Sequence, residues 1–278
     1  MDTETVSSQS CFPRDLVRRT AAFWDAHPCD GYPHIVDRMR FRYHKEPWLP
    51  QLLHKIVETT KNGSMLELGC GQGTDAIYVC QRLGRDARYT GIDCSPASIE
   101  SARRASDELS NLRVEPQFLI GDVESLQFDD SMFDVLYSMG VLHHTPSIET
   151  ALSEAHRVLK PGRPAFVIVY RSGSLKLTTA NVVRKIARTV KRPTDHSAAR
   201  RYSRWLGTMV RECVDVPILR CYRRKQITTM FRLSGFDVLN IQPAGLSLPN
   251  IGVNRILEHL ARDLNIGSYW CVEARKKP

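Results

Sequence analysis

The stretch "MLELGCGQGTD", residues 65–75, joins the end of an apolar strand to a glycine-rich turn. Glycines at alternate positions let the backbone N–H groups of such a turn approach a nucleotide closely. The apolar run before the glycines predicts a buried strand, and residues 74–83 are predicted to form a helix that begins at the turn. The stretch therefore predicts a strand, loop and helix unit with a ligand site at the loop.

Strands and helices alternate along the chain on both sides of this unit. Helices separated by strands are typical of βαβ units around a parallel sheet. We predict an α/β fold with a doubly wound, mostly parallel sheet, preceded by a mainly helical region. The predicted strands are residues 64–69, 87–94, 113–122, 133–140, 164–170, 236–245 and 268–276, and the helices after the turn are 74–83, 95–109, 147–160 and 225–235.

The charges beside the glycines distinguish between possible nucleotides. A dinucleotide fingerprint reads G-x-G-x-x-G/A, but its third small position falls here on Thr74. Glu67 and Asp75 flank the turn, and each would repel a nearby pyrophosphate by an amount on the order of 4 kcal/mol. The same acids would attract a cation such as S-adenosylmethionine. The alternative is that Glu67 faces solvent and Asp75 is an ordinary acid at a helix start.

Two further acids follow at the ends of the next strands. Asp93 lies 20 residues beyond Gly73, where a carboxylate can bind two ribose hydroxyls. Asp122 follows the third strand and could reach an adenine amino group, with Val123 against the ring. An acid at a strand end can also be only a turn former. In this order and spacing, the acids indicate a nucleoside site.

Four motifs in order now resemble the class I S-adenosylmethionine-dependent methyltransferases, most closely the ubiquinone/menaquinone-biosynthesis-like branch that acts on small molecules. They are "LELGCGQGTD" (66–75), "GIDCSPASIESAR" (91–103), "GDVESLQFDDSMFDVLYSMGVLHHTP" (121–146) and "EAHRVLKPG" (154–162). The resemblance covers about residues 60–170. It implies a seven-stranded Rossmann-like sheet whose last strand is antiparallel, with the cofactor across the carboxyl ends of the strands.

The resemblance also implies roles for individual residues and segments. The methionine part would lie against Glu67 and the glycine loop, the ribose near Asp93, the adenine near Asp122, and the sulfonium near the end of the fourth strand. The complete expected cofactor set is Glu67, Gly69, Cys70, Gly71, Gly73, Asp93, Cys94, Asp122, Val123, Ser138 and Met139. The expected divisions are an N-terminal helical cap (1–62), the S-adenosylmethionine-binding core (63–170), a basic helical insertion acting as substrate lid (171–225) and the C-terminal part of the sheet (226–278).

Methyl transfer requires a nucleophile held in line with the methyl group, and a general base if that nucleophile arrives protonated. His143 and His144 follow the fourth strand, and a neutral imidazole there could remove a proton near pH 7. Tyr43 is a third catalytic candidate. Either histidine could instead stabilise the loop by hydrogen bonding. Neighbouring histidines point in different directions, and no cluster of metal-ligand spacing is present, so we expect no metal.

Aromatic and basic residues around the predicted core could bind the acceptor. In the cap these are Trp24, Arg42 and His44, although Trp24 could equally pack in a core. Residues 171–225 hold 15 Lys/Arg against 3 Asp/Glu, a net +12 that leaves −3 for the rest of the chain, whose total is +9. This segment, with Tyr202 and Trp205, could bind an acidic small substrate, contact a partner subunit, or form a solvent-exposed helical face.

The composition indicates a globular protein without a bilayer-spanning run, and we expect a cytoplasmic enzyme of secondary metabolism. Eight scattered cysteines without a CxxC pair argue against a disulfide framework. The predicted function is methyl transfer from S-adenosyl-L-methionine to O, N or C of a secondary metabolite or a quinone- or isoprenoid-like acceptor. A homo-oligomer is one option. The alternatives are an RNA or DNA methyltransferase that uses segment 171–225, and a non-catalytic nucleoside-binding protein on the same fold.

Overall fold

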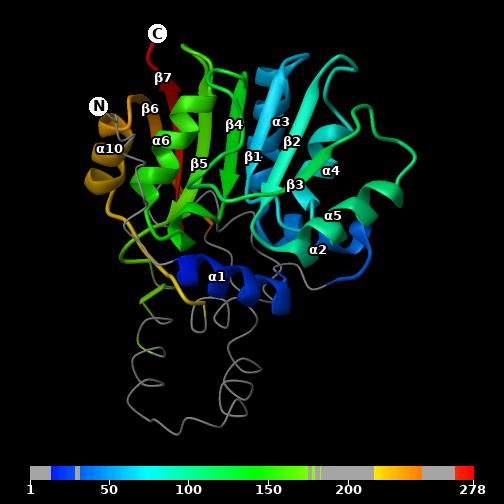
Figure 1. Cartoon of the computed structure of the whole chain (residues 1–278), viewed down its shortest axis with the longest axis horizontal. Coiled ribbons are helices and arrows are strands. Elements are labelled where there is room, and N and C mark those ends of the chain that lie inside the picture. The colour runs from blue at the N-terminus through cyan, green and yellow to red at the C-terminus, as the bar shows by residue number, and fades with distance from the viewer. Residues whose placement is uncertain (1–13, 29–31, 175–176, 179–181, 183–215, 246–266) are drawn as a thin grey trace, which may run out of the picture.

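The computed structural model describes residues 14–28, 32–174, 177–178, 182, 216–245 and 267–278. Its strands form one seven-stranded sheet in the order β3-β2-β1-β4-β5-β7-β6 (Figure 1). β1 to β5 pair in parallel, whereas β7 runs antiparallel to both β5 and β6. The predicted fold class, including the antiparallel last strand, is confirmed. The strands are β1 (Ser64–Leu68), β2 (Arg88–Asp93), β3 (Gln117–Ile120), β4 (Val135–Met139), β5 (Pro164–Tyr170), β6 (Phe236–Ala244) and β7 (Tyr269–Lys276).

Helices cover both faces of the sheet. The described helices are α1 (Arg14–Ala26), α2 (Ile35–Lys45), α3 (Leu49–Thr60), α4 (Thr74–Cys80), α5 (Pro96–Asp107), the short 3₁₀ helix η1 (Leu142–His144), α6 (Ile148–Val158) and α10 (Arg224–Leu233). α3, α4 and α5 pack on one face, and α6 and α10 pack on the other. The first half of the chain beyond α2 therefore supplies one layer and the later helices supply the opposite layer.

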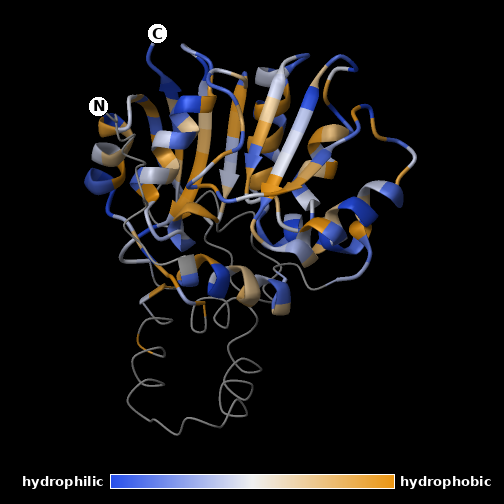
Figure 2. Ribbon diagram, viewed as in Figure 1, coloured by the Kyte–Doolittle hydropathy of each residue, from blue (hydrophilic) through white to orange (hydrophobic). Residues whose placement is uncertain are grey.

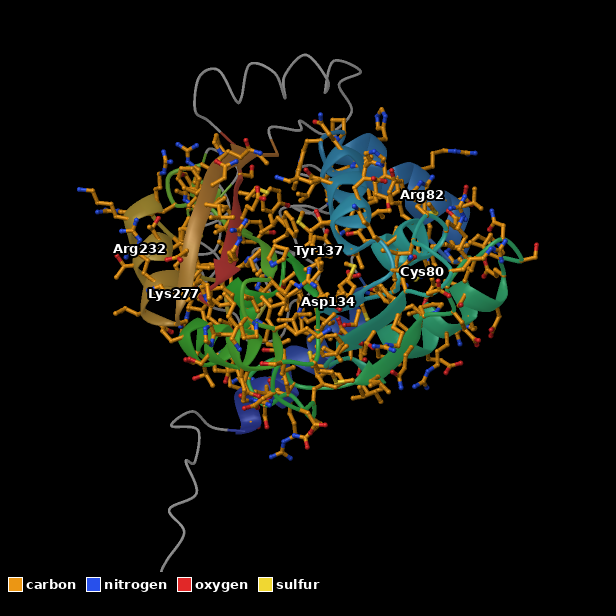
Figure 3. All side chains as sticks on the ribbon, turned by 90° about the horizontal axis from the view of Figure 1, so that it is seen from above. Cys80, Arg82, Asp134, Tyr137, Arg232 and Lys277 are labelled. Carbon is orange, nitrogen blue, oxygen red and sulfur yellow. The ribbon has the colours of Figure 1, made fainter. Side chains whose placement is uncertain are left out.

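The strands are apolar on both sides because both faces are covered. In β4, Val135 and Tyr137 pack in the core beneath α3 and α4, and Leu136 between them packs in the core beneath α6. Figure 2 shows this hydrophobic concentration along the central strands. Seen from above, Tyr137 lies among the interior side chains, whereas Arg82 and Arg232 lie at the periphery (Figure 3). Burial in two separate cores fixes the register of each central strand.

Local signals set the helix starts around the sheet. Ser95 caps α5 by accepting a hydrogen bond from the Ser98 N–H at 3.0 Å, and Pro96 occupies the first turn, as predicted. Ser147 caps α6 in the same way through the Thr150 N–H at 3.1 Å. Both caps stand directly after loops at the carboxyl ends of strands, so they fix where those loops end.

The N-terminal helices have two different positions. α1 crosses beneath the carboxyl ends of the strands and contacts α5 (Figure 1). α2 packs on α4, whereas α3 packs on α4 and β4 and so belongs to a covering layer of the sheet. Only α1 and α2 therefore lie where a cap over the site is expected. No helix in the described ranges is both long and apolar enough to cross a membrane.

Candidate functional site

A cavity opens at the carboxyl ends of β1, β2 and β4, with α1 along its outer side. It is lined by residues from the glycine loop, from the loops after β2, β3 and β4, and from α1 and α2. The lining residues are Val17, Thr20, Trp24, Pro28, Arg42, Glu67, Gly69, Cys70, Gly71, Gln72, Thr74, Asp75, Asp93, Cys94, Ser98, Gly121, Asp122, Val123, Met139, Gly140, Val141, His144, Thr145 and Pro146. Open parallel sheets place their ligands at this edge.

The glycine loop needs its glycines for two separate reasons. Gly69 has φ 74°, and a Cβ there would lie 2.0 Å from the Val141 side chain. Gly73 has φ 78° at the start of α4, and its Cβ would lie 3.0 Å from Ala102 of α5. Both conformations are rarely adopted by other residues. The loop is therefore set by its contacts with the β4 loop and with α5.

Glu67 of β1 is a buried carboxyl in the cavity wall, with 3% of its surface exposed. The hydroxyl of Tyr89, from β2, donates a hydrogen bond to Glu67 Oε2. Burial and the neighbouring Asp75 raise the pKa of Glu67 to about 8, against the opposing effect of this hydrogen bond. Glu67 is thus not a solvent-facing acid. Burial in the cavity wall favours the protonated, neutral form of its carboxyl group.

Asp75 is buried but its charge is compensated. Arg42 of α2 forms a forked ion pair with it, Nε to Oδ1 at 2.7 Å and Nη2 to Oδ2 at 2.6 Å. The Tyr137 hydroxyl donates to Oδ2 at 2.9 Å, and the Tyr43 hydroxyl donates to Oδ1 at 3.3 Å. The expectation that Asp75 attracts a cationic ligand is therefore corrected, because Arg42 neutralises Asp75.

Asp93 stands at the end of β2 and organises the backbone around it. Its Oδ2 accepts from the Gly71 N–H and its Oδ1 from the Ser95 N–H, both at 2.9 Å. Each carboxylate oxygen keeps a further lone pair for a ligand. Cys94 follows in the cavity wall, where burial raises the pKa of its thiol to about 12. The predicted position of Asp93 beside the glycine loop agrees with this geometry.

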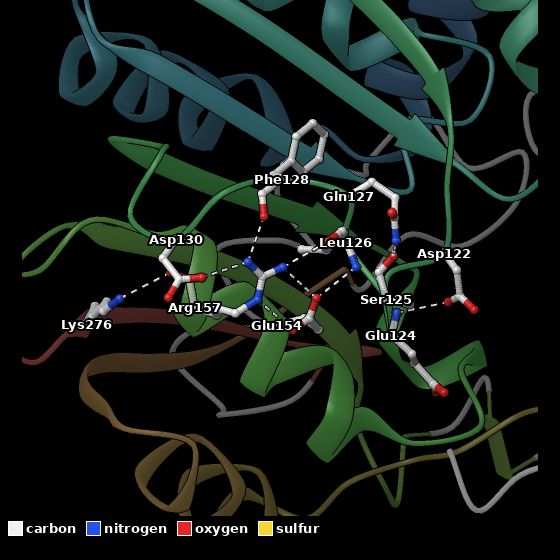
Figure 4. Close-up of polar contacts among 10 residues, drawn as sticks. All are labelled: Asp122, Glu124, Ser125, Leu126, Gln127, Phe128, Asp130, Glu154, Arg157 and Lys276. Atoms are coloured by element: carbon white, nitrogen blue, oxygen red, sulfur yellow. Dashed lines mark hydrogen bonds and ion pairs between the residues drawn. The ribbon is translucent and has the colours of Figure 1, made fainter. Parts of the chain in front are cut away.

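Asp122 and Val123 line the cavity in the loop of residues 122–130, which follows β3. Arg157 of α6 holds this loop by donating to Leu126 O at 2.9 Å and Phe128 O at 2.7 Å (Figure 4). Glu154 orients Arg157 with two bonds of 2.8 and 2.9 Å and accepts from the Leu126 N–H at 2.8 Å. Both residues belong to the "EAHRVLKPG" motif, so that motif supports the cavity from behind.

The end of β4 contributes one of its two expected residues to the lining. Met139 lies in the cavity wall. Ser138 is fully buried and its hydroxyl donates to Leu68 O at 3.1 Å, which joins β4 to β1 beneath the cavity. Alternation along a strand explains the difference, since successive side chains point to opposite faces.

The two histidines have different surroundings. His144 lines the cavity, and its Nδ1 lies 2.7 Å from Ile218 O. A carbonyl only accepts, so Nδ1 carries the proton and the neutral ring has its lone pair on Nε2. His143 is fully buried behind it, with its Nδ1 accepting from the Tyr170 N–H at 3.2 Å and its ring 3.9 Å from that of Tyr170. The structure brings His144 to the cavity and leaves His143 outside its lining.

The remaining predicted residues divide in the same way. Trp24 of α1 lines the cavity, and its ring centroid lies 5.3 Å from that of His144. Tyr43 is not among the lining residues, because its hydroxyl is directed to Asp75, and His44 is exposed on α2. Tyr202 and Trp205 lie outside the described residues. Within the described ranges, no group of His, Cys, Asp and Glu could hold a metal ion.

Comparison with known proteins gives a family for the central part of the chain. Residues 65–162 match the family model described as "Methyltransferase domain". The phthiotriol/phenolphthiotriol dimycocerosates methyltransferase of Mycobacterium leprae is 38% identical over 98 residues, which are 35% of this chain and 34% of that protein. The demethylmenaquinone methyltransferase of Staphylococcus epidermidis is 30% identical over 131 residues, 47% of this chain and 52% of that protein. The chain thus spans about half or less of these relatives' lengths.

Solved structures share the fold. An S-adenosylmethionine-dependent methyltransferase from Mesorhizobium loti superposes with a TM-score of 0.55 at 17% identity, over 81% of this chain and 96% of that one. At this identity the likeness concerns the fold alone.

Proposed function

We propose, from the membership of residues 65–162 in the methyltransferase-domain family, that the protein transfers a methyl group from S-adenosylmethionine to a small-molecule acceptor. The family match agrees with the resemblance predicted from the four motifs and supports S-adenosylmethionine as the cofactor. The main observation behind the proposal is that Glu67, Asp93, Asp122 and Met139 all line the same cavity.

The lining of the cavity supports the cofactor placement that the motifs predict. Asp93 has lone pairs for the ribose hydroxyls, and Asp122 and Val123 stand beside it for the adenine. We place the methionine part at Glu67, which is near the Asp75–Arg42 pair. When bound, the cofactor supplies a methyl group on a positively charged sulfur, so the chain has to orient an acceptor and exclude water.

We assign the general base to His144. Ile218 O fixes the ring so that Nε2 holds the lone pair, and Trp24 packs against the ring from α1. A proton on the acceptor would pass to this nitrogen as the new bond to the methyl carbon forms. His143 supports the position of His144 from behind, through its tilted ring contact with Tyr170 and the hydrogen bond that it accepts from the Tyr170 N–H.

The acceptor class is proposed from the relatives. Their names give demethylmenaquinone and phthiotriol/phenolphthiotriol dimycocerosates as the molecules methylated, and for this chain we propose a small organic acceptor with an apolar body. The apolar members of the lining, Val17, Trp24, Met139 and Val141, suit such a body near the methyl position. Acceptors of secondary metabolism would fit the same surface. Segment 171–225, proposed as the lid, lies mostly outside the described residues.

Two experiments test the proposal. Calorimetry with S-adenosylhomocysteine and with NAD should show binding of the first only, and binding of NAD alone would overturn it. A tritiated-methyl assay with extracts, followed by mass spectrometry, should label a small organic product. Label in RNA or DNA instead, with steeply salt-dependent binding, would favour a nucleic-acid methyltransferase. Cofactor binding without transfer to any acceptor would favour a binding protein.

A further inference from the structure

The Glu67 carboxyl stands out among the acids of the cavity because no cation in the described residues pairs with it. Asp75, the nearest acid, is held by the fork of Arg42 at 2.6 and 2.7 Å. Asp93 accepts two backbone N–H groups. Within the described residues, the Glu67 carboxyl accepts a hydrogen bond from the neutral hydroxyl of Tyr89. A buried carboxylate without a cation is costly, so this carboxyl has to be neutral until a positive group enters.

Tyr89 is well placed to hold that carboxyl still. It lies on β2, directly beside β1 in the register Met65 to Tyr89, and only 2% of its surface is exposed. Burial raises the pKa of its hydroxyl well above the usual value, so it remains a donor throughout the physiological range. A hydroxyl that donates to a carboxylate stabilises the charged form.

We propose that Tyr89 is a positioning residue, which holds the Glu67 carboxyl in the cavity wall so that the cation of the cofactor's methionine part displaces a proton from it. The proton leaves the carboxyl oxygen for solvent, and the carboxylate then pairs with the cationic group. The inference rests on the proposed function, and it adds that cofactor binding is coupled to pH through one residue pair.

The electrostatic surroundings of Glu67 agree with this coupling. Burial and the negative Asp75 and Asp93 hold its pKa near 8, while Tyr89 and Arg42 act in the opposite direction. At pH 7 the empty site is therefore mostly protonated at Glu67. The other titratable groups that face it are Cys70, Cys80 and Tyr137, and burial raises the pKa of each of them well above its usual value. They do not exchange protons in the same range, so Glu67 is the group that responds.

The first test needs only the full-length wild-type chain. Calorimetry at pH 7 in two buffers of different ionisation enthalpy counts the protons released on binding. S-adenosylmethionine should release more protons than 5′-methylthioadenosine, by up to about one per site, since burial keeps much of Glu67 protonated at this pH. The second ligand shares the ribose and adenine but lacks the charged amino acid part, so any proton from Asp93 cancels. Equal proton counts for the two ligands would overturn the inference.

The pH dependence gives a second measure. As the pH falls from 7.5 to 5.5 the Kd for S-adenosylmethionine should rise, by up to about tenfold per pH unit, because an increasing share of Glu67 must lose its proton first. Glu67→Gln should remove the steep dependence and lower the proton count to that of 5′-methylthioadenosine. A chain that binds none of these ligands would contradict the proposed function, whereas binding without proton release contradicts only the coupling.

Variants of two matched tyrosines identify the positioning residue. Tyr89→Phe removes the hydroxyl that favours the charged form, so the pH at which affinity levels off should move upward and the Kd at pH 7.5 should rise several-fold. Tyr269→Phe is the control, because Tyr269 is also buried but lies on β7, which β4 and β5 separate from β1 in the sheet. A purely structural Tyr89 would change the melting temperature in its variant while leaving the pH profile in place, and that result would refute its positioning role.

Discussion

Replacing Arg157 with alanine should loosen the loop of residues 122–130 and destabilise the protein. The side chain donates charge-assisted hydrogen bonds to Leu126 O and Phe128 O, and such bonds contribute about 1.5–3 kcal/mol each. Water can reach the vacated site, so the lower value applies to both and the expected loss is about 3 kcal/mol. The ion pair with Asp130 adds little, because Asp130 is 77% exposed.

Thermal unfolding and cofactor calorimetry measure the two consequences. A loss of this size should lower Tm by roughly 6–12 °C in a chain of this length. The loop carries Asp122 and Val123, and reordering even one residue on binding costs about 1–2 kcal/mol, so the Kd for S-adenosylhomocysteine should rise about tenfold.

The matched control is Arg104→Ala. Arg104 lies on α5 and pairs with Glu100 at 3.2 Å, with both side chains more than half exposed, so its loss should change stability by only about 0.5 kcal/mol or less. An Arg157→Ala protein that melts within 2 °C of the wild type, or that binds the cofactor equally well, would show that this side chain does not hold the loop.

Three further predictions concern the charged and catalytic groups. Arg42→Met should cost about 3–5 kcal/mol in urea unfolding, because Asp75 is left as a buried unpaired charge, and adding Asp75→Asn should recover most of the loss. His144→Gln should lower kcat by about 10²–10⁴ with little change in cofactor Kd, and equal losses in both would contradict a proton-transfer role. Burial opposes ionisation of Asp134, yet bonds from Lys160 and the Ser64 N–H and hydroxyl lower its pKa to about 2. Because the pKa of Asp134 is depressed in the folded state, its ionisation contributes about 2 kcal/mol to the free energy of unfolding above pH 4, and this contribution is lost as the pH falls toward 2. The Asp134→Asn protein should therefore be less stable than the wild type at pH 7 but equally stable near pH 2, as measured by urea unfolding at both pH values.

The sequence predicts the sheet well because its signals are local. The apolar run of β4 and the Ser95 cap each need only a few neighbouring residues. Several boundaries differ by one to three residues, and the largest difference is at the third strand, which was predicted from residue 113, whereas β3 begins at Gln117. Pro116 lacks the N–H that a ladder requires, which explains the later start. Pro243 is tolerated within β6 because β6 is an edge strand.

The candidate site was predictable where spacing carries the information. Glu67, Asp93 and Asp122 end successive strands, and parallel strands bring such ends to one edge of the sheet. The partners of these acids were not predictable, because they come from distant segments. Arg42 is 33 residues from Asp75, and Tyr89 is 22 residues from Glu67 and looks like an ordinary strand residue.

Supporting residues were missed for a similar reason. Arg157 looks like a solvated helical arginine in the sequence, and only the folded loop gives it two carbonyls to bind. For the adjacent histidines, the sequence predicts side chains that point in different directions, whereas their ring centroids lie 4.2 Å apart. It could not say which of them reaches the cavity, since that depends on Tyr170 and Ile218, which lie far along the chain.

The forked ion pair between Arg42 and Asp75 limits which chimaeric proteins could be made from this chain and its relatives. A polypeptide trimmed to the family segment, residues 65–162, would keep the aspartate and lose its guanidinium. Grafting a foreign N-terminal region onto the core would meet the same problem unless it brought an arginine to the same place or the aspartate were replaced. Changes of acceptor preference through swapped N-terminal helices are therefore expected to require substitutions at both ends of this bond.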